Sequence, residues 1–187
     1  ATSHPNISAM EITSLSLAGS CYLVSPLDPA FLPFVRSLAV CLTRGASLAR
    51  ISPLLPQLTS LTILSVHPDP IARCVTLSTS LKILSLSLHT IGKLDLDSRA
   101  KIQADIEGLC IRFENMPGSD QQTAVCAIIS GSRAMRKVIL DGTKSRPHGK
   151  TLGTLTSILV PVCKKAKVEL WKENFKADNG KVDLESE

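Results

Sequence analysis

A segment with two glycines and several basic residues, residues 138–151 (VILDGTKSRPHGKT), contains the residue types that hold phosphates, but its spacing does not fit that chemistry. A phosphate-binding loop needs G-x4-G-K-[ST], because consecutive backbone amides and one lysine surround the phosphates. Six residues separate Gly142 from Gly149, and Pro147 has no amide proton to donate. Only 36 residues follow, too few for the rest of a nucleotide-binding sheet. We therefore interpret the segment as a basic surface loop.

The nucleophiles and histidines of the chain form no pattern of catalysis or metal binding. His67-Pro68-Asp69 matches the tripeptide that stimulates Hsp70-type chaperones, but it follows a predicted strand and is interpreted as a turn. No G-x-S-x-G segment or CxxC pair occurs, so we predict no catalytic residue, metal or cofactor, and no enzyme. The six cysteines are expected to be buried free thiols, although their even number permits disulfides.

A repeated apolar pattern indicates what positions the other side chains. The frame apolar-x-x-apolar-x-apolar occurs seven times, with one lysine among its framed positions. The central residues of the seven predicted strands are Leu15, Leu38, Leu64, Leu84, Leu109, Val138 and Val168. Their separations are 20–30 residues, which suits one short strand and one return segment per repeat.

The segments between the strands predict return helices. Ser98 is expected to cap a helix over residues 99–106, and Asp120 to begin one that Gly131 ends. A third helix places Leu152, Leu155 and Leu159 on one face and is expected to end before Pro161. Several prolines between residues 26 and 56 predict short or irregular returns there. Alternating strands and helices indicate an α/β fold with parallel strands.

Residues 58–66 (LTSLTILSV) and 80–88 (SLKILSLSL) resemble the strands of the leucine-rich-repeat family, and the resemblance covers roughly residues 10–175. It implies a solenoid with about seven parallel strands on a concave face and helical or irregular returns on the convex face. Residues 169–175 and 180–184 are similar to the ends of repeat proteins of mushroom-forming fungi, often F-box proteins, although no F-box precedes the repeats. The family's asparagine ladder is missing, which departs from its turn geometry.

Composition is consistent with one folded domain. Of 187 residues, 44% are hydrophobic and 20% charged, enough to form a core. We predict a single domain with an N-terminal cap over residues 1–11, repeats over 12–171 and an acidic tail over 172–187. No apolar run is long enough for a membrane helix and no signal peptide is visible, so we expect a cytoplasmic protein without excluding secretion.

The predicted concave face suggests where a partner binds. In the frame above, the outward positions near the C-terminal end combine charge with the single tryptophan of the chain. The candidate binding residues are His67, Arg112, Arg136, Lys137, Asp141, Lys167, Glu169 and Trp171. Tryptophan and arginine often dominate interface energies. The alternative for Trp171 is that it covers the end of the core.

Charge is unevenly distributed along the chain, whose net charge is +5. Residues 133–167 hold nine Lys or Arg and one acid, whereas residues 169–187 hold six acids and three lysines. We expect a non-catalytic scaffold that recognises a protein partner. The alternative is a stand-alone defence or cytotoxic factor that binds carbohydrate or nucleic acid. The oligomeric state is not predicted.

Overall fold

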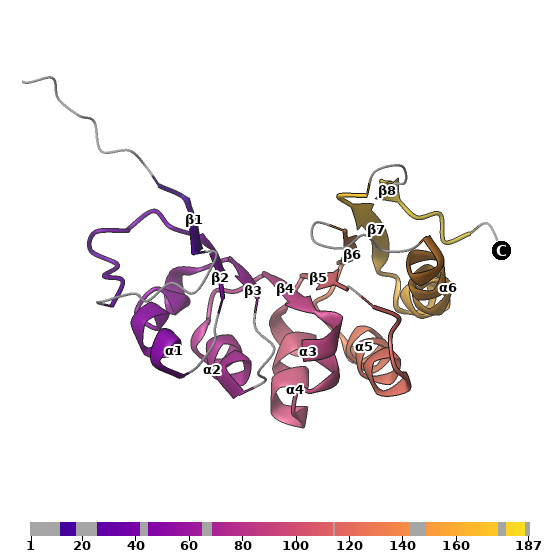
Figure 1. Ribbon diagram of the computed structural model, residues 1–187, viewed down its shortest axis with the longest axis horizontal. Coiled ribbons are helices and arrows are strands. Elements are labelled where there is room, and N and C mark those ends of the chain that lie inside the picture. The colour runs from indigo at the N-terminus through magenta and orange to yellow at the C-terminus, as the bar shows by residue number, and fades with distance from the viewer. Residues whose placement is uncertain are drawn as a thin grey trace, which may run out of the picture.

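The computed structural model describes residues 12–17, 26–41, 45–64, 69–113, 115–142, 149–175 and 179–185. These residues form one eight-stranded sheet, in which each strand lies beside the next one in the sequence. Strands β1 to β7 are parallel and β8 is antiparallel to β7. The helices lie on one side of the sheet, and the strands follow an arc that opens away from them (Figure 1). The predicted α/β fold with a mostly parallel sheet is thereby confirmed.

The strands are short, as expected for one strand in each repeat. They are β1 (Ser14–Leu17), β2 (Ser37–Val40), β3 (Ser60–Ile63), β4 (Ile83–Ser87), β5 (Gly108–Arg112), β6 (Lys137–Asp141), β7 (Glu169–Glu173) and β8 (Gly180–Lys181). Apart from α3, which has five residues, the α-helices become longer toward the C-terminus. They are α1 (Gly45–Ile51), α2 (Asp69–Leu77), α3 (Leu88–Gly92), α4 (Leu96–Asp105), α5 (Ser119–Gly131) and α6 (Gly149–Ala166), and a 3-10 turn, η1, spans Leu55–Gln57.

The pairing of the strands shows a more regular repeat than the one predicted. Leu15, Leu38, Leu61 and Leu84 are partners in successive strands, each 23 residues after the one before. The row continues through Leu109, Val138 and Leu170. Two predicted central residues are therefore wrong, since Leu61 replaces Leu64 and Leu170 replaces Val168.

The physical reason for the first correction lies in burial along β3. The leucines at 58, 61 and 64 fit the apolar frame equally well when it is shifted by three residues. Alternate residues of a strand face the same side, so Leu61 must share a face with Ile63. Both are fully buried, whereas Leu64 is only half-buried.

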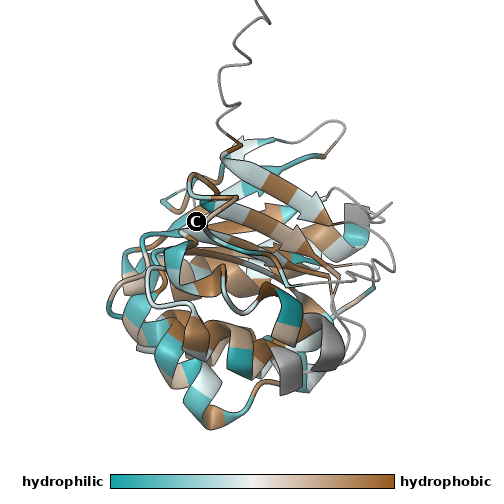
Figure 2. Ribbon diagram, turned by 90° about the vertical axis from the view of Figure 1, so that its left-hand side faces the viewer, coloured by the Kyte–Doolittle hydropathy of each residue, from teal (hydrophilic) through white to brown (hydrophobic). Residues whose placement is uncertain are grey.

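One continuous hydrophobic core fills the space between the sheet and the helices. The inward residues of the strands meet aliphatic side chains from the helices, and Leu152, Leu155 and Leu159, predicted to share one helix face, are all buried in α6. Hydrophilic and hydrophobic residues alternate along both kinds of element, as expected where one side is covered (Figure 2). No helix in the described part of the chain has the length and apolar content needed to cross a bilayer.

Several predicted boundaries are wrong for local reasons. Helix α4 begins earlier than expected, because the Asp95 carboxylate accepts a hydrogen bond from the Ser98 amide at 2.7 Å and caps the helix. Helix α6 continues through Pro161 to Ala166. Pro161 and the residue four positions before it, Ser157, are both exposed, so the carbonyl that loses its amide partner faces solvent.

Two further segments can be compared with the predictions. Residues 26–36 between β1 and β2 contain turns but no helix, which confirms an irregular return for that part. Part of the predicted acidic tail instead forms β8, and Val182 and Leu184 pack against the end of the core. The five described cysteines are free thiols, of which Cys74 and Cys163 are buried.

Candidate interaction surface

The face of the sheet that points away from the helices, here called the open face, is built from alternate strand residues. Because neighbouring strands are in register, these residues form rows across the sheet. One row contains Ser16, Ala39, Thr62, Ser85, Cys110, Ile139 and Trp171. The row before it contains Ser14, Ser37, Ser60, Ile83, Gly108, Lys137 and Glu169.

The two ends of the open face differ in chemistry. Over β1 to β3 the two rows contain only serine, alanine and threonine, which present little side-chain area. Over β5 to β8 they contain Cys110, Ile139 and Trp171, flanked by charged residues. Large apolar side chains on a rigid strand surface can anchor a partner, so the C-terminal end of the open face is the better candidate for a binding surface.

Trp171 on β7 is held in place by charged neighbours. Its indole Nε1 donates a hydrogen bond to Glu169 Oε2 at 3.0 Å, and the Nζ of Lys137 lies 4.3 Å from the centre of the ring. A cation over an indole face is attracted by the electron density of the ring. Lys137 Nζ also lies 3.2 Å from Glu173 Oε1. The half-buried ring is therefore fixed at one edge by a carboxylate and against one face by an ammonium group.

Glu169 connects β7 to the terminal strand β8. Its Oε1 accepts a hydrogen bond from Lys181 Nζ at 2.6 Å, while its Oε2 accepts from the indole of Trp171. The hydrogen bond from Lys181 lowers the pKa of the Glu169 carboxyl most, and the one from Trp171 adds to this. Both donors favour the ionised form, so Glu169 is a carboxylate at neutral pH. We call Lys137, Glu169, Trp171, Glu173 and Lys181 the Trp171 cluster.

A third row lies where the strands end. It places Arg112 beside Asp141 and Asp141 beside Glu173. Asp141 Oδ1 accepts a hydrogen bond from Asn174 Nδ2 at 2.8 Å. Arg112 is half-buried and its Nη2 donates to the backbone carbonyl of Ile63, so its guanidinium reaches across β4 to the end of β3. Arg112 therefore links strands of the sheet.

The structure brings some of the predicted residues together and separates others. Lys137, Glu169 and Trp171 meet in the Trp171 cluster, and Asp141 lies beside it. Trp171 lies one residue after the central residue of β7, Leu170, rather than three residues after the predicted centre Val168, because the seventh strand is shifted by two residues. Lys167 is not on the open face: it lies in the turn before β7, as Arg136 lies before β6. His67 lies outside the described residues.

Sequence reasoning missed Glu173, Lys181 and Asn174. The first two belong to the Trp171 cluster, and Asn174 contacts Asp141. They were missed because residues 172–187 were interpreted as a tail. The signal that could have indicated β8 is the alternation of Lys181, Val182, Asp183 and Leu184, which is typical of a strand with one covered side.

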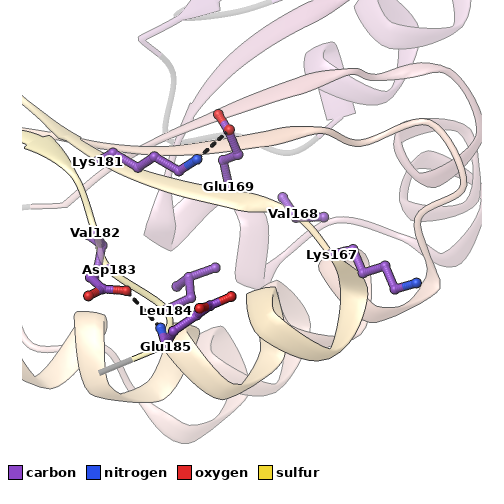
Figure 3. A pocket seen from close by; sticks show the side chains of 8 residues that line it. All are labelled: Lys167, Val168, Glu169, Lys181, Val182, Asp183, Leu184 and Glu185. Carbon is purple, nitrogen blue, oxygen red and sulfur yellow. Dashed lines mark hydrogen bonds and ion pairs between the residues drawn. The ribbon is translucent and has the colours of Figure 1, made fainter. Parts of the chain in front are cut away.

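A hollow of about 470 Å³ lies beside the cluster, lined by residues 167–169 and 181–185. Figure 3 shows the Lys181–Glu169 pair on its wall. Its lining mixes lysines, carboxylates and aliphatic side chains, which indicates no single ligand class. Among the described residues, no group of three His, Cys, Asp or Glu side chains is arranged to hold a metal ion. Comparison of the chain with protein-family models, curated proteins and solved structures found no match.

Proposed function

We propose that this chain is a leucine-rich-repeat-like solenoid that recognises a protein partner through the Trp171 cluster. The 23-residue spacing of the first four strands falls within the 20–29 residues of such repeats. The order of the strands and the placement of the helices on one side also agree with this architecture. In this proposal the open face is the concave recognition surface.

The observation that carries the proposal is the fixed orientation of Trp171. A tryptophan held by Glu169 and Lys137 before binding loses little side-chain freedom when a partner arrives. Ile139 and Cys110 extend the apolar area from the ring along the same row, and both are half-buried. The charged groups of Lys137, Glu173 and Lys181 surround this area, as polar residues surround the apolar centre of many interfaces.

The cluster also sets the chemistry of the partner. The indole and Ile139, which lie side by side on paired strands, suit contact with an apolar side chain. The two ion pairs, Lys137–Glu173 and Lys181–Glu169, lie at the surface. In each pair the positive and the negative charge neutralise one another. These pairs orient the side chains of the cluster more than they strengthen binding of the partner, because exposed ion pairs contribute about 0–1 kcal/mol. The partner surface is therefore an apolar side chain surrounded by polar groups.

The proposal is tested with Trp171→Ala and a control, Thr62→Ala, from the same row of the open face. Each protein captures partners from a nuclease-treated extract of its source, and the retained proteins are quantified by mass spectrometry. We expect one protein to bind the wild type and Thr62→Ala equally, and to bind Trp171→Ala about 30-fold more weakly, the loss typical of a dominant interface residue. Equal capture by Trp171→Ala, with its fold intact by circular dichroism, would contradict the proposal.

A further inference from the structure

A second group of side chains lies away from the open face, at the edge of the sheet where β6 and β7 begin. Arg133 and Arg136 belong to the loop between α5 and β6. Lys164 and Lys165 end α6, and Lys167 lies in the turn before β7. All five side chains are exposed. We call them the basic edge.

Backbone hydrogen bonds bring the two loops side by side. The Glu169 amide donates to the Arg136 carbonyl at 2.9 Å. The two segments of the chain therefore enter the sheet as neighbouring strands, about 4.8 Å apart. The Lys167 amide donates to the Lys164 carbonyl at 3.2 Å, which closes the last turn of α6. Lys167 has a φ of 58°, a left-handed conformation that ends the helix at that residue. Figure 3 shows its side chain extending away from the Glu169–Lys181 pair.

Among the described residues, the basic edge lacks the ion pairs that four other lysines form, as do Lys93 and Lys150. Lys82, Lys101, Lys137 and Lys181 each lie within 2.6–3.3 Å of a carboxylate oxygen. Within the described residues, none of the five basic-edge side chains forms such a pair. Arg136 is near enough to Glu107 to lower the pKa of that carboxyl, but Lys82 lowers it more and already binds it at 2.9 Å.

Stabilisation of the fold explains only part of this arrangement. Lysines in the last turn of a helix interact favourably with its C-terminal dipole, which accounts for Lys164 and Lys165. Arg133 directly follows Ser132, the C-cap of α5, and can interact with the dipole of that helix, whereas Arg136 lies farther from any helix end. Mutual repulsion among clustered cations opposes folding, and an anionic ligand would relieve it.

We propose that the basic edge binds the phosphate backbone of a nucleic-acid duplex, independently of the partner of the open face. Arginine and lysine neutralise phosphates without reading sequence. The two segments, residues 132–136 before β6 and residues 163–168 at the end of α6, contain no aromatic side chain, so they lack the stacking surface that single strands require. None of the exposed large apolar side chains among the described residues lies in these loops, and a membrane surface would need some.

The test measures the fluorescence anisotropy of a labelled DNA duplex of about 20 base pairs in 50–200 mM salt. Five phosphate contacts predict that affinity falls about 500-fold over this range. The variant Arg133→Gln/Arg136→Gln/Lys165→Gln keeps two of them and should lose only about 12-fold, while binding more weakly at 50 mM. The control Arg73→Gln/Lys93→Gln/Lys150→Gln removes the same charge from exposed residues elsewhere and should keep the steep salt dependence.

Two additional probes distinguish the phosphate backbone from other anions. Polyglutamate of matched charge and vesicles containing phosphatidylserine are titrated under the same conditions. Weaker binding of both than of the duplex, together with the predicted difference between the variants, supports the proposal. It is overturned by absence of duplex binding at 50 mM salt, by equal losses in the two variants, or by binding of either probe as tight as that of the duplex.

Discussion

Replacing Leu61 and Leu64 separately by alanine tests the strand register on which the open face depends. Leu61 is fully buried on the covered face of β3, and its truncation to alanine removes three carbon atoms from the core. Transfer of these atoms costs about 2.4 kcal/mol at about 0.8 kcal/mol each. The cavity left behind raises the expected loss to about 3–5 kcal/mol. Leu64 is half-buried just after the end of β3, so its truncation leaves no enclosed cavity. We expect Leu64→Ala to lose about 1 kcal/mol of stability.

The assay is equilibrium unfolding in urea, followed by circular dichroism and by the fluorescence of Trp171, the only tryptophan of the chain. Leu84→Ala serves as the control, because Leu84 is the fully buried partner of Leu61 in β4 and should lose as much. A loss for Leu64→Ala equal to or larger than that for Leu61→Ala would refute the register. The rows of the open face would then have to be assigned again.

Three further predictions concern single positions. Gly142→Ala should lose about 1–3 kcal/mol of stability, since its Cβ would lie 2.8 Å from the Asn174 carbonyl oxygen. Gly153→Ala should gain about 1 kcal/mol, because Gly153 lies on α6 with open space around it. Urea unfolding measures both changes. The pKa of Glu169, followed by carbon NMR, should lie below its ordinary value of 4.5 and rise in Lys181→Met. Because this pKa is lowered on folding, the interaction stabilises the protein above the ordinary pKa and is lost as pH falls through the lowered one. Burial raises the pKa of Cys74 and Cys163 to about 12, so both thiols should resist alkylation by iodoacetamide at pH 8 in the native protein. Mass spectrometry should find both alkylated only after unfolding. Rapid alkylation of the native protein would contradict their burial.

The repeat could be predicted because each strand has to bury the same side. A strand with one covered face alternates apolar and outward residues, and this pattern is visible around Leu38, Leu84 and Leu109. It is ambiguous at Leu61, where leucines three residues apart allow two frames, and only burial against the helices distinguishes them. At Leu170 the ambiguity arises because Val168, just before the strand, is also buried.

The Trp171 cluster could be predicted only in part. Lys137, Glu169 and Trp171 were identifiable as outward residues of large size or charge. Lys181 reaches the cluster only because the chain reverses after β7 and β8 pairs antiparallel to it, and Glu173 joins it because β7 extends to that residue. That reversal uses Asn174 at a φ of 61° and a hydrogen bond from the Phe175 amide to Asn179 Oδ1 at 2.8 Å, contacts that a search for a regular repeat does not reveal. Arg112 shows the opposite error, because an outward arginine also binds the backbone of β3.

Site-specific photo-cross-linking tests recognition by the open face most directly. A photoreactive phenylalanine analogue is placed at Ile139, which is paired with Trp171, or at Ala39, which lies in the same row over β2. Both variants are irradiated in an extract of the source, and cross-linked proteins are identified by mass spectrometry. The account predicts that one protein cross-links at Ile139 but not at Ala39, and that Trp171→Ala abolishes the cross-link. Cross-linking of the same proteins at both positions, or of none at Ile139, would contradict it.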